Sequence, residues 1–271
     1  MQWFWIYMNA MMLLQQSITI SIPAREETSV SATSFYEHIR SADWKERDSI
    51  AVSEMLSGNI PEFYRRFVPV TVVLGNAAQD SILEATYYVA PDYLCIGSDQ
   101  DWARIPLTPM AAQVIADSFH CFLPTRKMVD DIYEAAEVKL RPMPLLAYRD
   151  SSLTFWHHHL IIEGQRRGRK GLIAGIKKDV ILTSRILAAS RPNRVAIYGW
   201  HHLDGSPIQP PYTGHVKYYV DYSHGIRLVY RKININGTWM DYTEILRDET
   251  LRRLLCDEKV CDFERYSTKA F

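Results

Sequence analysis

Residues 198–229 read YGWHHLDGSPIQPPYTGHVKYYVDYSHGIRLV, and this stretch decides the fold of the C-terminal half. Strand-favouring residues at 194–202 and 216–230 flank a segment rich in proline and glycine. Turn residues between two β-branched and aromatic runs are typical of a connection between antiparallel strands. We therefore expect an antiparallel sheet in the C-terminal half, built around these two strands.

The neighbouring sequence adds helices to this sheet. Residues 241–256 carry leucine and isoleucine at helical spacing and predict a helix packed on the sheet. Further short apolar runs predict strands at 153–159, 171–176 and 180–182.

The N-terminal half predicts helices and a hairpin. A helix is expected over 43–56, and two strands at 67–74 and 82–89 surround Gly75 and Asn76. Two more helices are expected to start at the capping threonines Thr108 and Thr125, reaching residues 118 and 138. Strands and helices alternate without a βαβ rhythm, so the class is α+β. We expect one globular domain over 24–271, with a sub-boundary near 141–150 where prolines interrupt the chain.

The first 23 residues have the features of an export signal. They contain no charged side chain, and the apolar run from Trp3 to Leu14 is too short to span a bilayer. We expect residues 1–23 to be a signal peptide and the mature chain to be secreted or periplasmic, with no stable membrane insertion after processing. The alternative is a buried N-terminal helix or strand.

The four cysteines suggest disulfides. Cys256 and Cys261 are five residues apart, which makes closure of a small loop easy, and Cys95 and Cys121 allow a second bridge. Alternatively, Cys121 is the nucleophile of a thiol hydrolase, since it lies shortly before the helix expected to start at Thr125.

Composition narrows the classes of partner. Lys plus Arg and Asp plus Glu both number 31, so the net charge is zero, which argues against a nucleic-acid binder. The 16 tyrosines and 7 tryptophans favour instead a surface that contacts peptides or sugars.

The candidate site consists of His201, His215, Asp221 and His224, with Lys178 as an electrostatic stabiliser. Histidine titrates near neutral pH and often binds metals. On a straight strand His215 and Asp221 would lie roughly 20 Å apart, so a single site requires a bend after His215.

Of the adjacent pair His201 and His202, alternation favours His201. It shares a strand face with Ile197 and Gly199, and the missing side chain of Gly199 is expected to leave space for a ligand.

Two kinds of chemistry fit these residues. His201, His215, Asp221 and His224 are suitable metal ligands, and zinc is one metal that such a set can hold, although no standard spacing is present. Without a metal, a histidine acts as general base, Asp221 orients it, and Lys178 or Arg227 stabilises developing charge.

The function predicted from the sequence is therefore that of a secreted hydrolase, acting on a peptide or on a cell-wall polymer through a histidine–aspartate site. The alternatives are a secreted binding protein that uses an aromatic surface without catalysis, and the thiol hydrolase that depends on Cys121.

Overall fold

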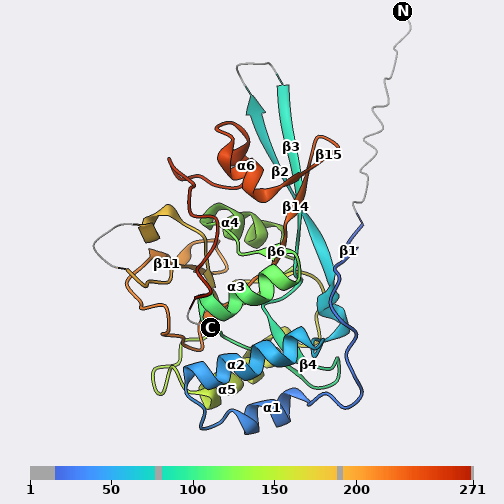
Figure 1. Ribbon diagram of the computed structural model, residues 1–271, viewed down its shortest axis with the longest axis vertical. Coiled ribbons are helices and arrows are strands. Elements are labelled where there is room, and N and C mark those ends of the chain that lie inside the picture. Colours follow the sequence, from blue (N-terminus) through green and yellow to red (C-terminus); the bar gives the residue numbers. More distant parts are fainter. Residues whose placement is uncertain (1–15, 77–80, 188–191, 270–271) are drawn as a thin grey trace, which may run out of the picture.

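A computed structural model describes residues 16–76, 81–187 and 192–269 and confirms the mixed α+β class (Figure 1). The helices are α1 (Ala32–His38), α2 (Trp44–Leu56), η1 (Glu62–Arg65), α3 (Pro109–Ser118), α4 (Arg126–Ala135), α5 (Ser152–Arg166), η2 (Ser184–Leu187), α6 (Tyr242–Arg247) and η3 (Leu251–Leu254). The strands are β1 (Ile18–Thr19), β2 (Arg66–Asn76), β3 (Ser81–Val89), β4 (Cys95–Gly97), β5 (Trp102–Arg104), β6 (Cys121–Phe122), β7 (Val138–Lys139), β8 (Ile173–Ala174), β9 (Lys178–Val180), β10 (Ile197–His201), β11 (Pro207–Tyr212), β12 (His224–Gly225), β13 (Val229–Tyr230), β14 (Lys232–Ile235) and β15 (Thr238–Asp241).

The larger sheet draws strands from both halves of the chain. Its main path is β1-β2-β3-β13-β6, and β14 pairs with both β3 and β15. The predicted hairpin is confirmed as β2 and β3, paired antiparallel from Val68 opposite Val89 outward. In Figure 1 this hairpin extends from one end of the molecule beside α6, whereas α1, α2 and α5 lie at the opposite end.

A smaller sheet has the order β11-β10-β9-β12 and carries the candidate site. The prediction for 194–202 is confirmed by β10, but its antiparallel partners are β9 and β11, and β11 lies within the proline-rich segment predicted as a loop. The predicted strand over 216–230 is wrong. That region turns at Asp221, whose carboxylate accepts hydrogen bonds from the Ser223 backbone N–H and hydroxyl. Such a local turn competes with strand formation, and only β12 and β13 remain, in two different sheets.

The predicted strand at 153–159 is also wrong, because these residues belong to α5. Its buried side chains include Phe155, His158, His159 and Ile162, which follow the i, i+3, i+4, i+7 spacing of one helix face. Ser151 caps the first turn by accepting a hydrogen bond from the Leu153 N–H. The aromatic content of the segment is typical of strands, but burial of one helical face determines the outcome.

Local capping confirms the other predicted helix starts. Asp43, Thr108 and Thr125 cap α2, α3 and α4 with their side chains. The helix expected over 241–256 divides into α6 and η3, because the carboxylate of Asp248 accepts hydrogen bonds from the Thr250 and Leu251 N–H groups and starts a new turn.

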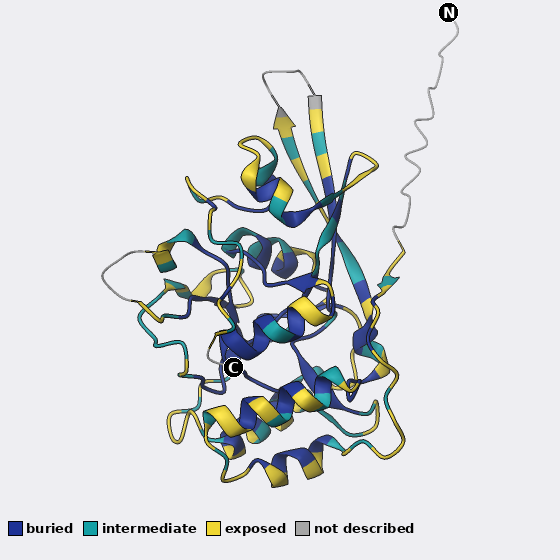
Figure 2. Cartoon of the chain, in the orientation of Figure 1, coloured by how far each residue is buried: buried dark blue, intermediate teal, exposed yellow. Residues whose placement is uncertain are grey.

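The helices at the α1–α2–α5 end cover the core with one face each (Figure 2). In α2, for example, Ala51, Val52 and Met55 are buried. Buried residues continue from these helices through α3 into the larger sheet.

Most of the predicted signal peptide, residues 1–15, lies outside the described residues. Residues 16–23 include β1, which pairs with β2 at Phe67 and Arg66, and Ile20 and Ile22 are part of the core. Removal of the chain up to residue 23 would therefore remove contacts of the folded protein. In the described ranges no helix has both the length and the apolar character needed to cross a membrane.

One predicted disulfide is confirmed, between Cys256 and Cys261. The second is not formed, because Cys95 and Cys121 are free thiols, both buried.

Loss of this disulfide should weaken the fold by a modest amount. Replacing Cys256 and Cys261 together by serine frees a short loop in the unfolded chain, which should lower the free energy of unfolding by about 2 kcal/mol. Urea unfolding of the double variant against the oxidised wild type measures the difference. Identical midpoints would show that the bridge does not stabilise the chain.

Candidate functional site

Three of the predicted site residues lie together. The ring centroids of His215 and His224 are 5.6 Å apart, and His224 Nε2 is 3.9 Å from Asp221 Oδ1. Lys178 lies beside them, because β9 and β12 run parallel with Lys178 opposite His224. We refer to Lys178, His215, Asp221 and His224 as the histidine–aspartate cluster. The bend required after His215 is a turn in which the Tyr219 N–H donates to Val216 O, and the turn at Asp221 follows it.

Asp221 is held in place by several donors. Arg149 Nη2 lies 2.8 Å from Oδ2, while the Ser223 N–H and hydroxyl both bind Oδ1. Burial acts to raise the pKa of Asp221, but His224, Ser223 and Lys178 outweigh it, so the pKa lies below its usual value. The carboxylate is therefore ionised at neutral pH and serves as a fixed negative charge.

His224 is fully buried, and its Nε2 has no hydrogen-bond partner. Burial lowers the pKa of His224, and although Asp221 raises it, the neighbouring His215 and lysines lower it further. The imidazole is thus neutral at physiological pH and packs behind His215.

His215 is the half-buried imidazole of the cluster. It packs between Tyr212 and Tyr219, with ring centroids at 5.1 and 4.6 Å. Its pKa is lowered, chiefly by burial. A neutral, half-buried imidazole is able to accept a proton from a bound molecule.

Lys178 lies with its Nζ 5.0 Å from the centre of the Trp200 ring. Trp200 has a φ of 59°, unusual for a bulky residue, and follows Gly199 at 103° beside a register shift between β10 and β11. Its backbone N–H donates to Lys177 O, which holds the backbone of Trp200 beside the strand that carries Lys178. Backbone strain of this kind concentrates at functional sites.

His201 has different partners. Its Nε2 is 3.0 Å from Asp130 Oδ1, which also accepts a hydrogen bond from the Tyr198 hydroxyl, and its ring stacks on Tyr133. Among the described residues it forms no hydrogen bond, ion pair or ring contact with the histidine–aspartate cluster. The prediction that Gly199 leaves space for a ligand is wrong, because a Cβ there would lie 3.2 Å from the His201 ring itself.

The metal hypothesis gains no support. Within the residues that the structure describes, no group of three or more His, Cys, Asp and Glu side chains is placed to hold a metal ion. Asp221 is already engaged by Arg149 and Ser223, and His201 is bound to Asp130.

Cys121 is placed unfavourably for nucleophilic chemistry. Its side chain is buried, its Sγ donates to Phe119 O, and burial raises its pKa well above the usual value. A protonated thiol inside the core is a poor nucleophile.

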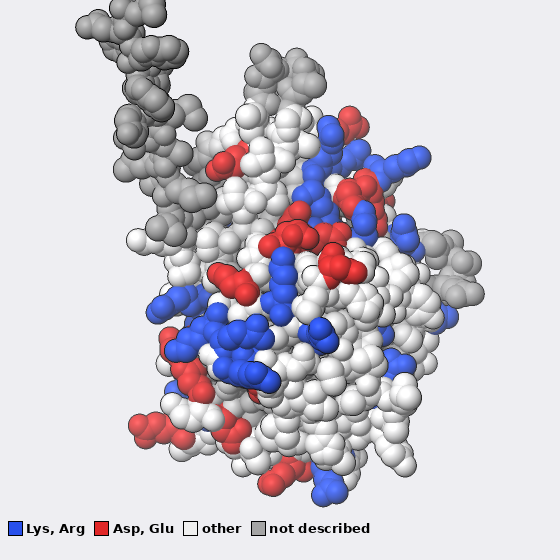
Figure 3. All heavy atoms as spheres, turned by 180° about the vertical axis from the view of Figure 1, so that it is seen from behind, with Lys and Arg blue, Asp and Glu red and all other residues white. Residues whose placement is uncertain are grey.

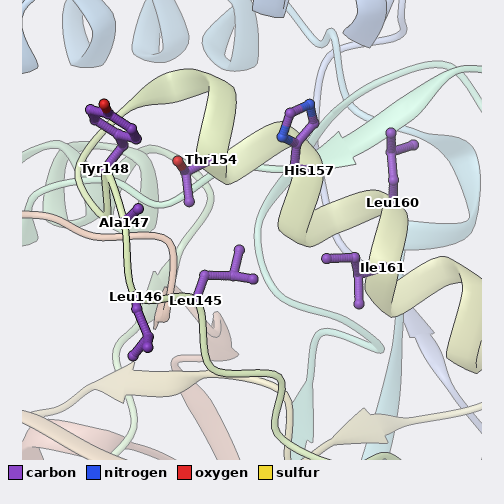
Figure 4. Close-up of a pocket in the computed structure, with 8 residues that line it drawn as sticks. All are labelled: Leu145, Leu146, Ala147, Tyr148, Thr154, His157, Leu160 and Ile161. Carbon is purple, nitrogen blue, oxygen red and sulfur yellow. The ribbon is translucent and has the colours of Figure 1, made fainter.

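An apolar groove of about 650 Å³ lies between α5 and the segment before it (Figure 4). It is lined by Leu145, Leu146, Ala147 and Tyr148 from the segment before α5, and by Thr154, His157, Leu160 and Ile161 from α5. The segment continues into Arg149, which reaches Asp221.

Tyr222 connects the wall of the groove to the cluster through three hydrogen bonds. Its hydroxyl accepts a hydrogen bond from the Leu145 N–H, its N–H donates to Arg149 O, and its carbonyl accepts one from Lys177 Nζ. The prolines near 141–150 predicted a sub-boundary there, and Arg149 was not among the predicted site residues. The polar run Tyr148-Arg149-Asp150 is the one local feature that could have indicated a functional residue. No local pattern connects it with Asp221, which lies 72 positions away.

The basic stretch at 165–178 is not one surface. Arg166 pairs with Glu163 and Asp92, and Lys177 and Lys178 are buried. The exposed part of this stretch is the loop 167–171. On the face drawn in Figure 3, Lys and Arg gather in one region interleaved with carboxylates, while a broad neighbouring region carries few charges.

No protein-family model, curated protein or solved structure matches this chain.

Proposed function

We propose that the protein is a hydrolase whose reacting centre is the histidine–aspartate cluster, with His215 as general base. The observation that carries the proposal is the contact between His215 and His224 beside the buried Asp221 carboxylate. A neutral, half-buried imidazole backed by fixed charges is what proton transfer to and from a substrate requires.

In the proposed reaction, His215 transfers the proton and Lys178 stabilises the negative charge. His215 removes a proton from water, and the water oxygen attacks the carbonyl carbon of an amide or ester. The carbonyl oxygen gains negative charge, which the ammonium group of Lys178 stabilises. The carbon–leaving-group bond then breaks, and His215 returns the proton to the departing amine or alcohol. Asp221 positions the turn that carries His224 and keeps Arg149 at the edge of the cluster.

Peptide or cell-wall material is the proposed substrate class. The groove is apolar and holds a tyrosine and a histidine, which suits a peptide side chain or an acyl group. Export to an oxidising compartment remains part of the proposal. The Cys256–Cys261 disulfide and the uncharged start of the chain support it.

The direct test is hydrolysis by the purified full chain. Peptides with free and blocked C-termini, simple esters and purified cell-wall polymer would be incubated with the protein, and released amines, alcohols and acids measured. Turnover of one class supports a hydrolase. Binding of these compounds without any turnover would contradict it and favour a binding protein.

The pH dependence of hydrolysis should follow the protonation of His215. Burial lowers the pKa of His215; Asp221 raises it, whereas Lys178 and Arg149 lower it, and His224 packs against the ring as a neutral group. A general base works when unprotonated, so activity should be full at neutral pH and fall as the pH drops through a pKa below 6.5. A profile of kcat/KM against pH measures this. An activity that instead rises on acidification would exclude His215 as the base.

The second candidate is a non-catalytic binding protein. It is favoured by the exposure of apolar side chains around the groove, with Leu146 92% and Tyr148 81% exposed. Saturable binding of a peptide that survives intact would distinguish it from the hydrolase.

A further inference from the structure

Lys178 is an exception among the buried cations of the described residues. Six lysines and arginines are buried there, and the other five each hydrogen-bond to a protein oxygen. They are Arg47 to Asp48, Arg65 to the carbonyls of Ile22 and Pro23, Arg104 to Asp92, Lys177 to the Tyr222 carbonyl, and Arg227 to the carbonyls of Ala90 and Ile173. Lys178 is 6% exposed, yet its ammonium group has neither a hydrogen bond nor an ion pair in the described chain.

The nearest carboxylate does not compensate for this charge. Asp221 affects Lys178 electrostatically, but its oxygens bind Arg149 and Ser223 and lie beyond ion-pair distance from the Lys178 ammonium. Contact with the Trp200 ring compensates only in part, because a ring face attracts a cation more weakly than an anion does. A buried cation in this state is stabilised by any anion that reaches it.

The surroundings indicate which anion. Two groups that interact electrostatically with Lys178 reach toward solvent: His215, which is half-buried, and Arg149, whose side chain is 42% exposed. Arg149 is already paired with Asp221, and the imidazole of His215 is neutral. The one uncompensated charge among these groups is therefore the Lys178 ammonium, which matches a ligand with a single negative charge. The groove, whose wall is joined to the cluster through Arg149 and Tyr222, is apolar, so the molecule that carries the charge has an apolar body.

We propose that Lys178 is the anchor of a carboxylate-binding subsite, and that its ligand is a carboxylic acid whose apolar part lies in the groove lined by Leu145, Tyr148 and Leu160. This inference rests on the proposed function, because hydrolysis of an amide or ester yields a carboxylate where the charged carbonyl oxygen stood. The acid product should therefore bind the resting protein and inhibit it.

The test compares an acid with its uncharged amide on the full chain. N-acetylphenylalanine and N-acetylphenylalaninamide would be titrated at constant ionic strength while NMR follows the ring resonance of His215, assigned with His215→Gln. The acid should shift this resonance saturably, and the amide should bind at least about tenfold more weakly, since it lacks the charge-assisted contact. Equal binding of acid and amide would overturn the proposal.

Variants locate the charge that is responsible. Lys178→Met should weaken acid binding at least about tenfold, while Lys178→Arg, which keeps the charge, should retain a measurable part of it. Lys170→Met is the matched control, because Lys170 is exposed on the loop after α5 and should have no effect. An unchanged affinity in Lys178→Met, or an equal loss in Lys170→Met, would refute the assignment. If Lys178→Met does not fold, the wild-type comparison of acid and amide still decides.

Two further comparisons separate a carboxylate site from a general anion site, and the subsite from the hydrolase. Acetate tests the carboxylate without an apolar body and should bind more weakly than N-acetylphenylalanine. Tighter binding of inorganic phosphate than of acetate would overturn the carboxylate assignment. Acid binding without turnover of any amide or ester would support the subsite and contradict the hydrolase. Turnover without preference for the acid would support the hydrolase and contradict the subsite.

Discussion

Replacement of His215 by Gln is expected to lower kcat/KM for hydrolysis by about 100-fold to 10,000-fold, the usual contribution of a general base. Glutamine fits the space between Tyr212 and Tyr219 but does not take up a proton at neutral pH. Initial rates on the best substrate of the hydrolysis panel measure the effect, and thermal unfolding checks that the fold persists.

His202 provides the matched control for this experiment. It is exposed and lies outside the cluster, so His202→Gln should leave the rate within a factor of about two, as for a surface substitution with little effect on stability. Equal activity of wild type and His215→Gln would remove His215 from the mechanism. A large loss in His202→Gln would move the site toward the other end of β10.

Replacement of Asp92 by Ala is expected to lower the free energy of unfolding by about 3–5 kcal/mol, because it removes the buried partner of Arg104 and leaves only the partly exposed Glu163. Asp92 and Arg104 are each 1% exposed and form two hydrogen bonds of 2.7 Å, from Nε to Oδ1 and from Nη2 to Oδ2. Burial disfavours the Arg104 charge, but Asp92 and Glu163 together more than offset this, so the pKa of Arg104 is raised. Urea unfolding monitored by circular dichroism measures the change.

Glu163 is the control for Asp92, since it contacts the same guanidinium group from a partly exposed position. Its carboxylate lies 2.7 Å from Arg104 Nη2, and its side chain is 29% exposed. Solvent screens this pair, so Glu163→Ala should lower the free energy of unfolding by about 1 kcal/mol or less. Equal losses in the two variants would show that burial does not determine the strength of these pairs.

The helix starts and the hairpin were predictable because their signals are local. A capping side chain such as Asp43 or Thr108 bonds an N–H only two or three residues away, so the sequence contains both partners. The β2–β3 hairpin likewise depends on two adjacent apolar runs and the short connection between them.

The C-terminal sheet was harder to predict because its pairing is not local. The run from Val216 to Tyr230 has the composition of a strand, but the carboxylate of Asp221 binds its own loop and breaks the run. The prolines of 207–212 suggested a loop, although they pair as β11 beside β10 at one edge of the smaller sheet. Proline is tolerated at such an edge because it has no N–H to leave unpaired.

The candidate site could also be predicted only in part, because some of its contacts are not local in the sequence. Histidine and aspartate density pointed to His215, Asp221 and His224, which do lie together. His201 met the same criteria, yet Asp130 and Tyr133 of α4 enclose it, and the sequence gives no sign of that contact. Arg149 belongs to the site through a pairing over 72 positions, which composition and spacing do not reveal.

Tyr222 makes the groove and the cluster a single mechanical unit. Its three polar groups bind the Leu145 N–H, the Arg149 carbonyl and the Lys177 ammonium, and its neighbour in the chain is Asp221. A molecule that pushes the Leu145 wall outward pulls on the tyrosine hydroxyl and hence on the peptide that carries the carboxylate. We therefore expect a ligand in the groove to change the hydrogen bonds of Tyr222 and, through the adjacent peptide, the position of the Asp221 carboxylate.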